Sequence, residues 1–279
     1  MDVGIIDRPG RLPFSPEAQK TIIRHRNHLD REGYDHVSAA ETLLMLGQGD
    51  LTAIVNAADS APADPYDPYG LRRRFYRKGC YHPSAGQLVF YPPKYDRDNR
   101  PYAEYLQAER INMDANGRAR RFSPLPDELE NDETLQKLVR IIFEMLPGDL
   151  IDRRREQEVG LHLTRLYSGG RQRAAPSPYW LHTDGEPWTS IILIDHYNVG
   201  RGSAVNYVAE RSCRGKQPQD CDRDDILATI SMQTPFEMIL VDDARVSHHV
   251  TGVHGADCNP GWRTSLLIDF SPLRPERTI

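Results

Sequence analysis

The spacing of apolar residues changes along this chain, and that change restricts the possible folds more than any other feature. From residue 159 onward the apolar residues fall into eight short runs, rich in β-branched and aromatic side chains and separated by Gly, Pro, Asn and Asp. Many short strands joined by loops predict a sandwich, a barrel or a jelly roll. The expected strands are Val159–Tyr167, Tyr179–Thr183, Thr189–Asp195, Ala204–Val208, Ile226–Met232, Phe236–Val241, Val246–Val253 and Thr264–Phe270.

The first 158 residues carry mainly helical signals. Ser15-Pro16 is typical of a helix start and Gly33 of its end. Ser38 and Glu41 form a capping-box pattern before a second helix. Other expected elements are a helix over 132–146, a loop over 61–70 and strands over 74–81 and 87–91. We expect one catalytic domain, in which the β core over 159–279 carries a helical and mixed extension over 1–158.

Composition excludes several classes of protein. The net charge of the 279 residues is -5, which argues against binding to nucleic acid. No apolar stretch approaches the ~20 residues of a membrane span, and no signal peptide is recognisable. Four scattered cysteines indicate reduced thiols, so we expect a cytoplasmic protein. We also expect its substrate to be a small molecule. The arginine triplets 72–74 and 153–155 have acids nearby, and we interpret them as solvated faces.

Two distant segments supply candidate metal ligands. In a strand, residues i and i+2 share a face, so His182 and Asp184 would converge on one point. His248 follows in a later strand-like run. Two imidazoles and one carboxylate can occupy one face of an octahedron, which is the arrangement of non-haem iron(II) oxygenases. A second His-x-Asp, at 28–30, lies in a helical segment, where its side chains point in different directions.

An arginine after these residues matches the needs of 2-oxoglutarate. That cosubstrate binds an open metal site through one end, and its distal carboxylate requires a separate anchor. Arg263 offers a charged, bidentate fork, and Ser265 on the same strand face offers a hydroxyl. The order of His-x-Asp, distal His and Arg-x-Ser is more specific than any of its parts.

The segment over 177–187, SPYWLHTDGEP, resembles the signature of a 2-oxoglutarate-Fe dioxygenase family that includes bacterial L-isoleucine hydroxylases. Stretches 160–165, 246–251 and 262–271 are also similar to that family, whereas residues before 159 match it only faintly. Gly202 to Asn206 departs from the family pattern. The resemblance implies a double-stranded β-helix, with iron on His182, Asp184 and His248 and the cosubstrate on Arg263. It favours His248 over the adjacent His249 as the third ligand.

The resemblance further implies hydroxylation of an unactivated C–H bond in a free, aliphatic L-amino acid. Fe(II), 2-oxoglutarate and O2 would be required, with ascorbate as a reductant in vitro. The Asp184 carboxylate argues against halogenation, because a small residue there would free a site for halide. Desaturation and oxidative cyclisation use the same cofactors and stay open. The alternatives from other classes are a cupin-type metalloenzyme, which would not need Arg263, and a non-catalytic jelly-roll binding module.

Three further residues are candidate substrate contacts. Arg165 would clamp a substrate carboxylate or form a structural ion pair. Glu186 would bind a substrate amine, support a metal ligand or stay solvated, and Trp180 would line the pocket or pack in the core. His162 is interpreted as an ordinary strand histidine, and Asp242-Asp243 as a turn.

Overall fold

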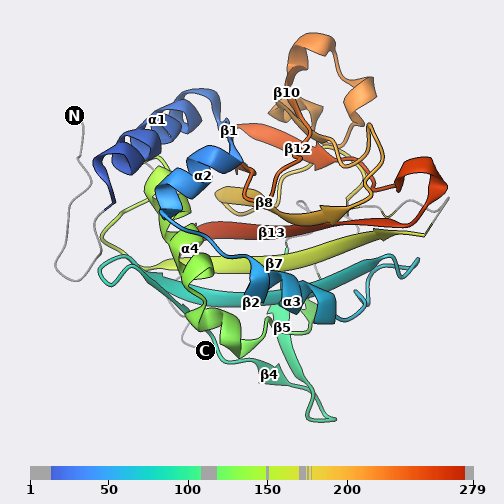
Figure 1. The fold of residues 1–279 in the computed structure, drawn as a ribbon, viewed down its shortest axis with the longest axis horizontal. Helices are drawn as coiled ribbons and strands as arrows, with labels where there is room; N and C mark the ends of the chain where they lie inside the picture. Colours follow the sequence, from blue (N-terminus) through green and yellow to red (C-terminus); the bar gives the residue numbers. More distant parts are fainter. Residues whose placement is uncertain are drawn as a thin grey trace.

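The computed structural model describes residues 14–107, 118–148, 151–169, 174, 176 and 178–273. Its centre is a seven-stranded sheet in the order β1-β11-β8-β13-β7-β2-β3, which joins strands from both halves of the chain (Figure 1). The long strand β13 runs antiparallel to both β7 and β8. These strands are β1 (Tyr34–Val37), β2 (Arg72–His82), β3 (Gln87–Phe90), β7 (Gln157–Ser168), β8 (Trp188–Tyr197), β11 (Met238–Asp242) and β13 (Gly261–Pro272).

Two smaller sheets complete the β structure. One has the order β10-β9-β12, and its strand β12, which carries His248, contacts β11 of the large sheet. The other has the order β4-β5-β6 and contacts β2 through β5 and β6 (Figure 1). Their strands are β9 (Asn206–Glu210), β10 (Ile226–Ile230), β12 (Val246–Val250), β4 (Lys94–Tyr95), β5 (Pro101–Tyr105) and β6 (Arg120–Phe122). Seven of the eight strands expected after residue 158 are present, with small shifts at their ends.

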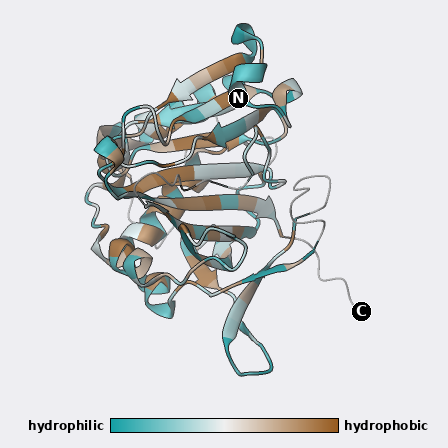
Figure 2. Cartoon of the chain, turned by 90° about the vertical axis from the view of Figure 1, so that its right-hand side faces the viewer, coloured by the Kyte–Doolittle hydropathy of each residue, from teal (hydrophilic) through white to brown (hydrophobic). Residues whose placement is uncertain are grey.

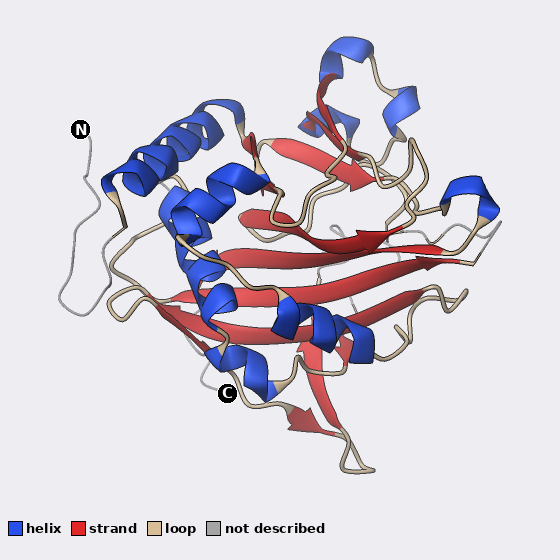
Figure 3. Ribbon diagram, in the orientation of Figure 1, coloured by secondary structure: helices blue, strands red, loops and turns tan. Residues whose placement is uncertain are grey.

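Four α-helices cover one face of the large sheet (Figure 3). They are α1 (Pro16–Glu32), α2 (Ala39–Leu46), α3 (Thr52–Ser60) and α4 (Glu133–Met145), and the 3-10 helices are η2 (Asp127–Asn131), η3 (Arg211–Cys213), η4 (Pro218–Asp220), η5 (Arg223–Asp225) and η6 (Ala256–Cys258). The predicted caps are present: Ser15 accepts a bond from the Ala18 amide, and Ser38 with Glu41 forms the capping box. Helix α3 was not predicted, because it begins after Leu51 without a side-chain cap.

Along β7 and β13, side chains alternate between the two faces of the large sheet. Odd-numbered β7 residues such as Leu161 and Leu163 join the core under the helices, as do Leu266, Ile268 and Phe270 of β13. The residues between them, such as His162, Thr164 and Ser265, line a cavity on the other face. Both faces are therefore covered, and the strands show as mixed apolar and polar bands in Figure 2. Register between β2, β7 and β13 decides which side chains reach the cavity.

Three local predictions were wrong. Residues 179–183 form no strand, and His182 makes only an isolated bridge to His248. The triplet 72–74 is not a solvated face, since Arg72 and Arg74 line the cavity and only Arg73 is exposed. In the second triplet, Arg153 donates to the Phe143 carbonyl near the end of α4, because the last helical carbonyls have no partner within the helix.

Candidate active site

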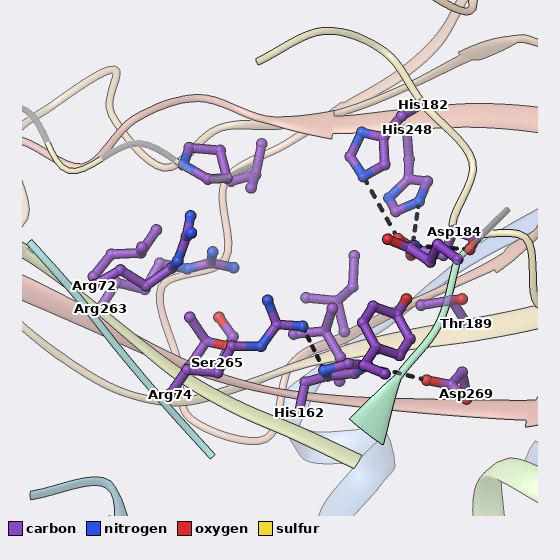
Figure 4. Close-up of a pocket in the computed structure, with 18 of the residues that line it drawn as sticks. Arg72, Arg74, His162, His182, Asp184, Thr189, His248, Arg263, Ser265 and Asp269 are labelled. Carbon is purple, nitrogen blue, oxygen red and sulfur yellow. Dashed lines mark hydrogen bonds and ion pairs between the residues drawn. The ribbon is translucent and has the colours of Figure 1, made fainter. Parts of the chain in front are cut away.

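The structure brings His182, Asp184 and His248 together at one end of the cavity (Figure 4). One ligand atom from each residue lies within 4.8 Å of the others. Asp184 Oδ2 is 3.2 Å from His248 Nε2, and Asp184 Oδ1 is 3.7 Å from His182 Nε2. The backbones of His182 and His248 exchange two 2.9 Å hydrogen bonds, and this bridge holds the imidazoles side by side. His182 therefore reaches the other two ligands through its pairing with β12, and not because it lies in a strand of its own.

The electrostatics of this cluster suit a divalent cation. Burial and the nearby charge of His248 lower the pKa of His182 to about 4, so this imidazole stays neutral. His182 Nδ1 donates to the Trp180 carbonyl at 3.0 Å, which leaves Nε2 as the lone-pair donor. Burial alone would raise the pKa of Asp184, but His248 and His182 hold it well below its usual value. Two imidazoles, each of which can bind a metal in its neutral form, beside an ionised carboxylate are the donor set expected for iron(II).

Asp243 supports the loop that carries Asp184. Its Oδ2 accepts a 2.7 Å hydrogen bond from the amide of Gly185, whose φ of 85° is left-handed. Gly185 therefore permits the sharp turn directly after the ligand. Asp243 was expected only as part of a turn, and no sequence pattern distinguishes this role because Gly185 lies 58 positions away.

One other group of potential metal ligands exists among the described residues. Cys80, His82 and Glu156 lie close together near the ends of β2 and β7, outside the cavity. Glu156 is exposed, and His82 Nδ1 already pairs with it at 2.7 Å. Burial raises the pKa of the Cys80 thiol to about 11, which keeps it protonated without a metal. The buried cluster in the cavity is the better candidate.

Arg263 lies at the far end of the cavity from Asp184 (Figure 4). Its side chain is 4% exposed, and Nε and Nη2 have no hydrogen-bond partner within the described part of the chain. Burial lowers the pKa of Arg263 to about 10, so the guanidinium is still charged at neutral pH. A buried, unpaired cation is costly unless a ligand supplies the opposite charge. Ser265 lines the same cavity, as its shared strand face requires.

The three candidate substrate contacts lie outside the cavity lining. Arg165 projects from the helix-covered face, where it donates to Thr264 Oγ1 at 2.6 Å and pairs with Asp59 and Asp195; it is the structural ion pair. Trp180 contributes its carbonyl to His182. Glu186 lies near Asp269 and Ser271, and burial raises the pKa of its carboxyl group. The predicted substrate roles of Arg165 and of the Trp180 ring are therefore not supported.

Sequence reasoning missed the residues on the cavity wall made by β2, β5 to β7 and β13. His162 is not an ordinary strand histidine: it lines the cavity, stacks on Tyr76 at 4.3 Å and contacts Arg74 and Asp269 (Figure 4). Arg74, Tyr105, Gln107, Arg120 and Asp269 also line this wall. The one available signal was the alternation of β2, which places Arg72 and Arg74 on the same face.

Comparisons with known proteins agree with this geometry. Residues 56–269 match the family model described as 2OG-Fe dioxygenase. The chain is 29% identical over 209 residues to an L-isoleucine-4-hydroxylase of Bacillus thuringiensis, covering 74% of this chain and 80% of that protein. It is 23% identical over 260 residues to a 3(1)-hydroxy-L-isoleucine 4-dioxygenase of Pantoea ananatis, covering 89% and 96%.

A solved structure supports the fold. The Fe(II)/(alpha)ketoglutarate-dependent dioxygenase TqaL superposes with a TM-score of 0.68 at 16% identity, covering 95% of this chain and 93% of that one. The expected jelly-roll core with N-terminal helices is thereby confirmed. None of the helices in the described ranges has the length and apolar character needed to cross a membrane.

Proposed function

This chain belongs to the 2OG-Fe dioxygenase family, and we propose on that premise that it hydroxylates a free aliphatic L-amino acid. It is an enzyme that depends on Fe(II), 2-oxoglutarate and O2. The observation that carries the proposal is one cavity with the ligand cluster at one end and, at the other, the buried guanidinium of Arg263, whose Nε and Nη2 have no hydrogen-bond partner among the described residues.

In this proposal His182, Asp184 and His248 hold the iron. The convergence of their ligand atoms and the neutral state of His182 support that assignment. When bound there, iron with 2-oxoglutarate and O2 would supply the oxidising power for inserting one oxygen atom into a substrate C–H bond, the other oxygen atom being used to convert 2-oxoglutarate to succinate and carbon dioxide. The Asp184 carboxylate would take the position that a halide would need, which argues against halogenation.

Arg263 and Ser265 anchor the distal carboxylate of 2-oxoglutarate in this proposal. The burial of Arg263 and its lack of a protein partner among described residues support it. A guanidinium fork fits a carboxylate in bidentate geometry, and Ser265 adds a hydroxyl donor on the same strand face. The apolar residues Leu166, Ile191, Val250 and Leu267 line the cavity as well and would exclude water around the cosubstrate chain.

The substrate class comes from the relatives. Both curated relatives carry isoleucine or hydroxyisoleucine in their names, and they cover most of this chain. We also propose a cytoplasmic location, which four free thiols support because the cytosol keeps cysteines reduced.

A substrate panel tests the proposal. The protein is incubated with Fe(II), ascorbate, 2-oxoglutarate and single L-amino acids, with L-isoleucine, L-leucine and L-valine beside their D-enantiomers. We expect succinate to rise with at least one aliphatic L-amino acid, together with a product heavier by one oxygen atom. A product lighter by two hydrogens would indicate desaturation or ring closure. If no free amino acid increases succinate above the substrate-free control, the proposed substrate class is wrong.

A further inference from the structure

Two guanidinium groups stand side by side on the cavity wall that the N-terminal half contributes. Arg74 comes from β2 and Arg120 from β6, and both lie against the rings of Phe122 and Tyr105. Arg74 Cζ is 4.5 Å from the Phe122 ring centre, and Arg120 Cζ is 5.0 Å from that of Tyr105. Aromatic faces attract cations, but they carry no net charge that would neutralise them.

Neither guanidinium has a carboxylate partner among the described residues. Arg120 Nη2 donates to Gln107 Oε1 at 2.6 Å, and Arg74 Nη2 contacts His162 Nδ1; both acceptors are neutral groups. The Nε atoms of both arginines are buried, and no described residue accepts a hydrogen bond from them. Neighbouring Arg72 differs, because Asp64 pairs with it at 2.5 Å. Two like charges are thus held together in a shielded place, which is unfavourable unless an anion joins them.

A relay of buried groups orients Arg74 without neutralising it. His162 Nε2 lies 3.5 Å from Asp269 Oδ2, and Asp269 Oδ1 accepts a 3.0 Å bond from the Gly160 amide. Gly160 is required here, since a Cβ would lie 2.4 Å from that Oδ1. Burial and the charge of Arg74 hold the pKa of His162 well below its usual value. Its neutral ring therefore turns a lone pair at Nδ1 toward Arg74, while Nε2–H faces Asp269.

The pair is also connected to the metal ligands. Gln107, which accepts from Arg120, donates from its own Nε2 to the backbone carbonyl of Asp184 at 2.9 Å. An anion bound by Arg120 would therefore lie beside the metal end of the cavity. Arg263 lies at the other end and is already suited to the distal carboxylate of the cosubstrate (Figure 4).

We propose that Arg74 and Arg120 form a second anion site, distinct from Arg263, which binds the α-carboxylate of the amino-acid substrate. The inference rests on the proposed function, because it assigns a role within the same cavity. One carboxylate can accept from both guanidinium groups at once and would relieve their mutual repulsion. The substrate is thereby selected by a wall that belongs to the N-terminal half of the chain.

The test compares an amino acid with its carboxamide, which keeps the side chain and the amine but lacks the negative charge. The probe is the panel amino acid with the highest rate of succinate release. For the wild-type enzyme we expect the KM of the carboxamide to exceed that of the acid by about 100-fold, as two charge-assisted hydrogen bonds are lost. In Arg74→Gln and Arg120→Gln, the KM of the acid rises by about 30-fold or more and the acid-to-amide ratio shrinks to a few-fold.

Matched controls come from the same strands. Arg73→Gln and Arg121→Gln change neighbouring, exposed arginines and should leave both KM values within about threefold. The KM for 2-oxoglutarate should also stay unchanged in all four variants. That readout separates a substrate anchor from a general loss of structure.

The possible outcomes separate the two proposals. If the wild-type enzyme oxidises no free amino acid, the proposed function fails, and this assignment fails with it. If it oxidises amino acids but has equal KM values for the acid and the carboxamide, only the assignment of Arg74 and Arg120 as the carboxylate site is wrong. This comparison uses the wild-type enzyme, so it decides the question even if the variants do not fold. A rise in the KM for 2-oxoglutarate in place of the substrate KM would mean that the pair binds the cosubstrate instead.

Discussion

Two arginines on adjacent, paired strands show how differently the two faces of the large sheet are used. Arg165 of β7 projects toward helix α3, where two carboxylates and one hydroxyl satisfy it. Arg263 of β13 projects into the cavity, where its Nε and Nη2 have no partner in the part of the chain that the structure describes. Both side chains are buried to a similar degree, at 3% and 4% exposure. Burial alone therefore does not distinguish these two arginines; a carboxylate partner among the described residues does.

The same contrast holds for other residues on these faces. The helix-covered face is filled by apolar side chains that pack against α1 to α4. The cavity face carries the polar side chains of Arg74, His162 and Asp269. Substitutions on the cavity face should therefore affect catalysis or binding, whereas those on the helix face should affect stability.

The largest effect is expected at the metal end. Asp184→Ala removes the only carboxylate in the ligand cluster, and we expect succinate release to fall by at least ~1000-fold, equivalent to about 4 kcal/mol. The natural control is Asp30→Ala in the second His-x-Asp, which lies in α1 and should retain full activity. Amino-acid-dependent succinate release at the wild-type rate in Asp184→Ala would remove the assigned iron site.

A smaller, more selective effect is expected at the opposite end of the cavity. Arg263→Gln should raise the KM for 2-oxoglutarate by about 100-fold, because a bidentate charged contact is lost. The melting temperature of the ligand-free protein should not fall, since the substitution removes an uncompensated buried charge. Steady-state kinetics measures the KM for 2-oxoglutarate, and a thermal shift assay measures the melting temperature of the ligand-free protein. A destabilised apoprotein with an unchanged KM would reverse the assignment of the two arginines.

Arg165→Gln should behave in the opposite way. It leaves Asp59 and Asp195 without their cation and should lower the free energy of unfolding by about 1–3 kcal/mol, a range reduced because both carboxylates are partly solvated. The KM values for 2-oxoglutarate and amino acid should not change. Denaturant titration and steady-state kinetics on the same preparation provide the check; a selective rise in the substrate KM would restore the substrate role first considered for Arg165.

The smallest effect concerns pH. Burial raises the pKa of Asp269 to about 7, and burial with the charge of Asp184 raises that of Asp243 to about 8. Between about pH 4 and these values, each of these two carboxyl groups binds more protons in the folded protein than in the unfolded chain. The contribution of these two groups to the unfolding free energy of the metal-free protein should therefore decrease as pH rises through this window, by at most ~1.4 kcal/mol per pH unit for each carboxyl group. The lowered pKa values of His182 and His249 make a contribution of opposite sign between about pH 4 and pH 6.5.

Asp269→Asn tests the contribution of one carboxyl group. In metal-free protein it should remove the falling contribution of Asp269 between about pH 4 and pH 7, so the difference in unfolding free energy between wild type and variant should decrease as pH rises, while the contribution of Asp243 stays. An unaltered pH profile in Asp269→Asn would show that this carboxyl group titrates normally in the folded state.

The sequence by itself determined most of the local structure and part of the site. Caps at Ser15 and Ser38 and the apolar repeat before residue 146 predicted three helices, because these signals act within a few residues. The pattern of His-x-Asp, distal His and Arg-x-Ser identified the residues that the structure places around one cavity. The combined order of these residue types is rarely produced by chance, although each short motif alone is common.

Only the tertiary structure decided which faces of the strands meet. His182 lies in a loop, and its position comes from the bridge to His248, 66 residues later. Arg74, Arg120 and Arg165 cannot be told apart by residue type. The register of β2 and β7 and the placement of β6 direct the first two into the cavity and the third toward helix α3. A strand's alternation is encoded locally, but which of its two faces becomes the cavity depends on what the rest of the chain packs against it.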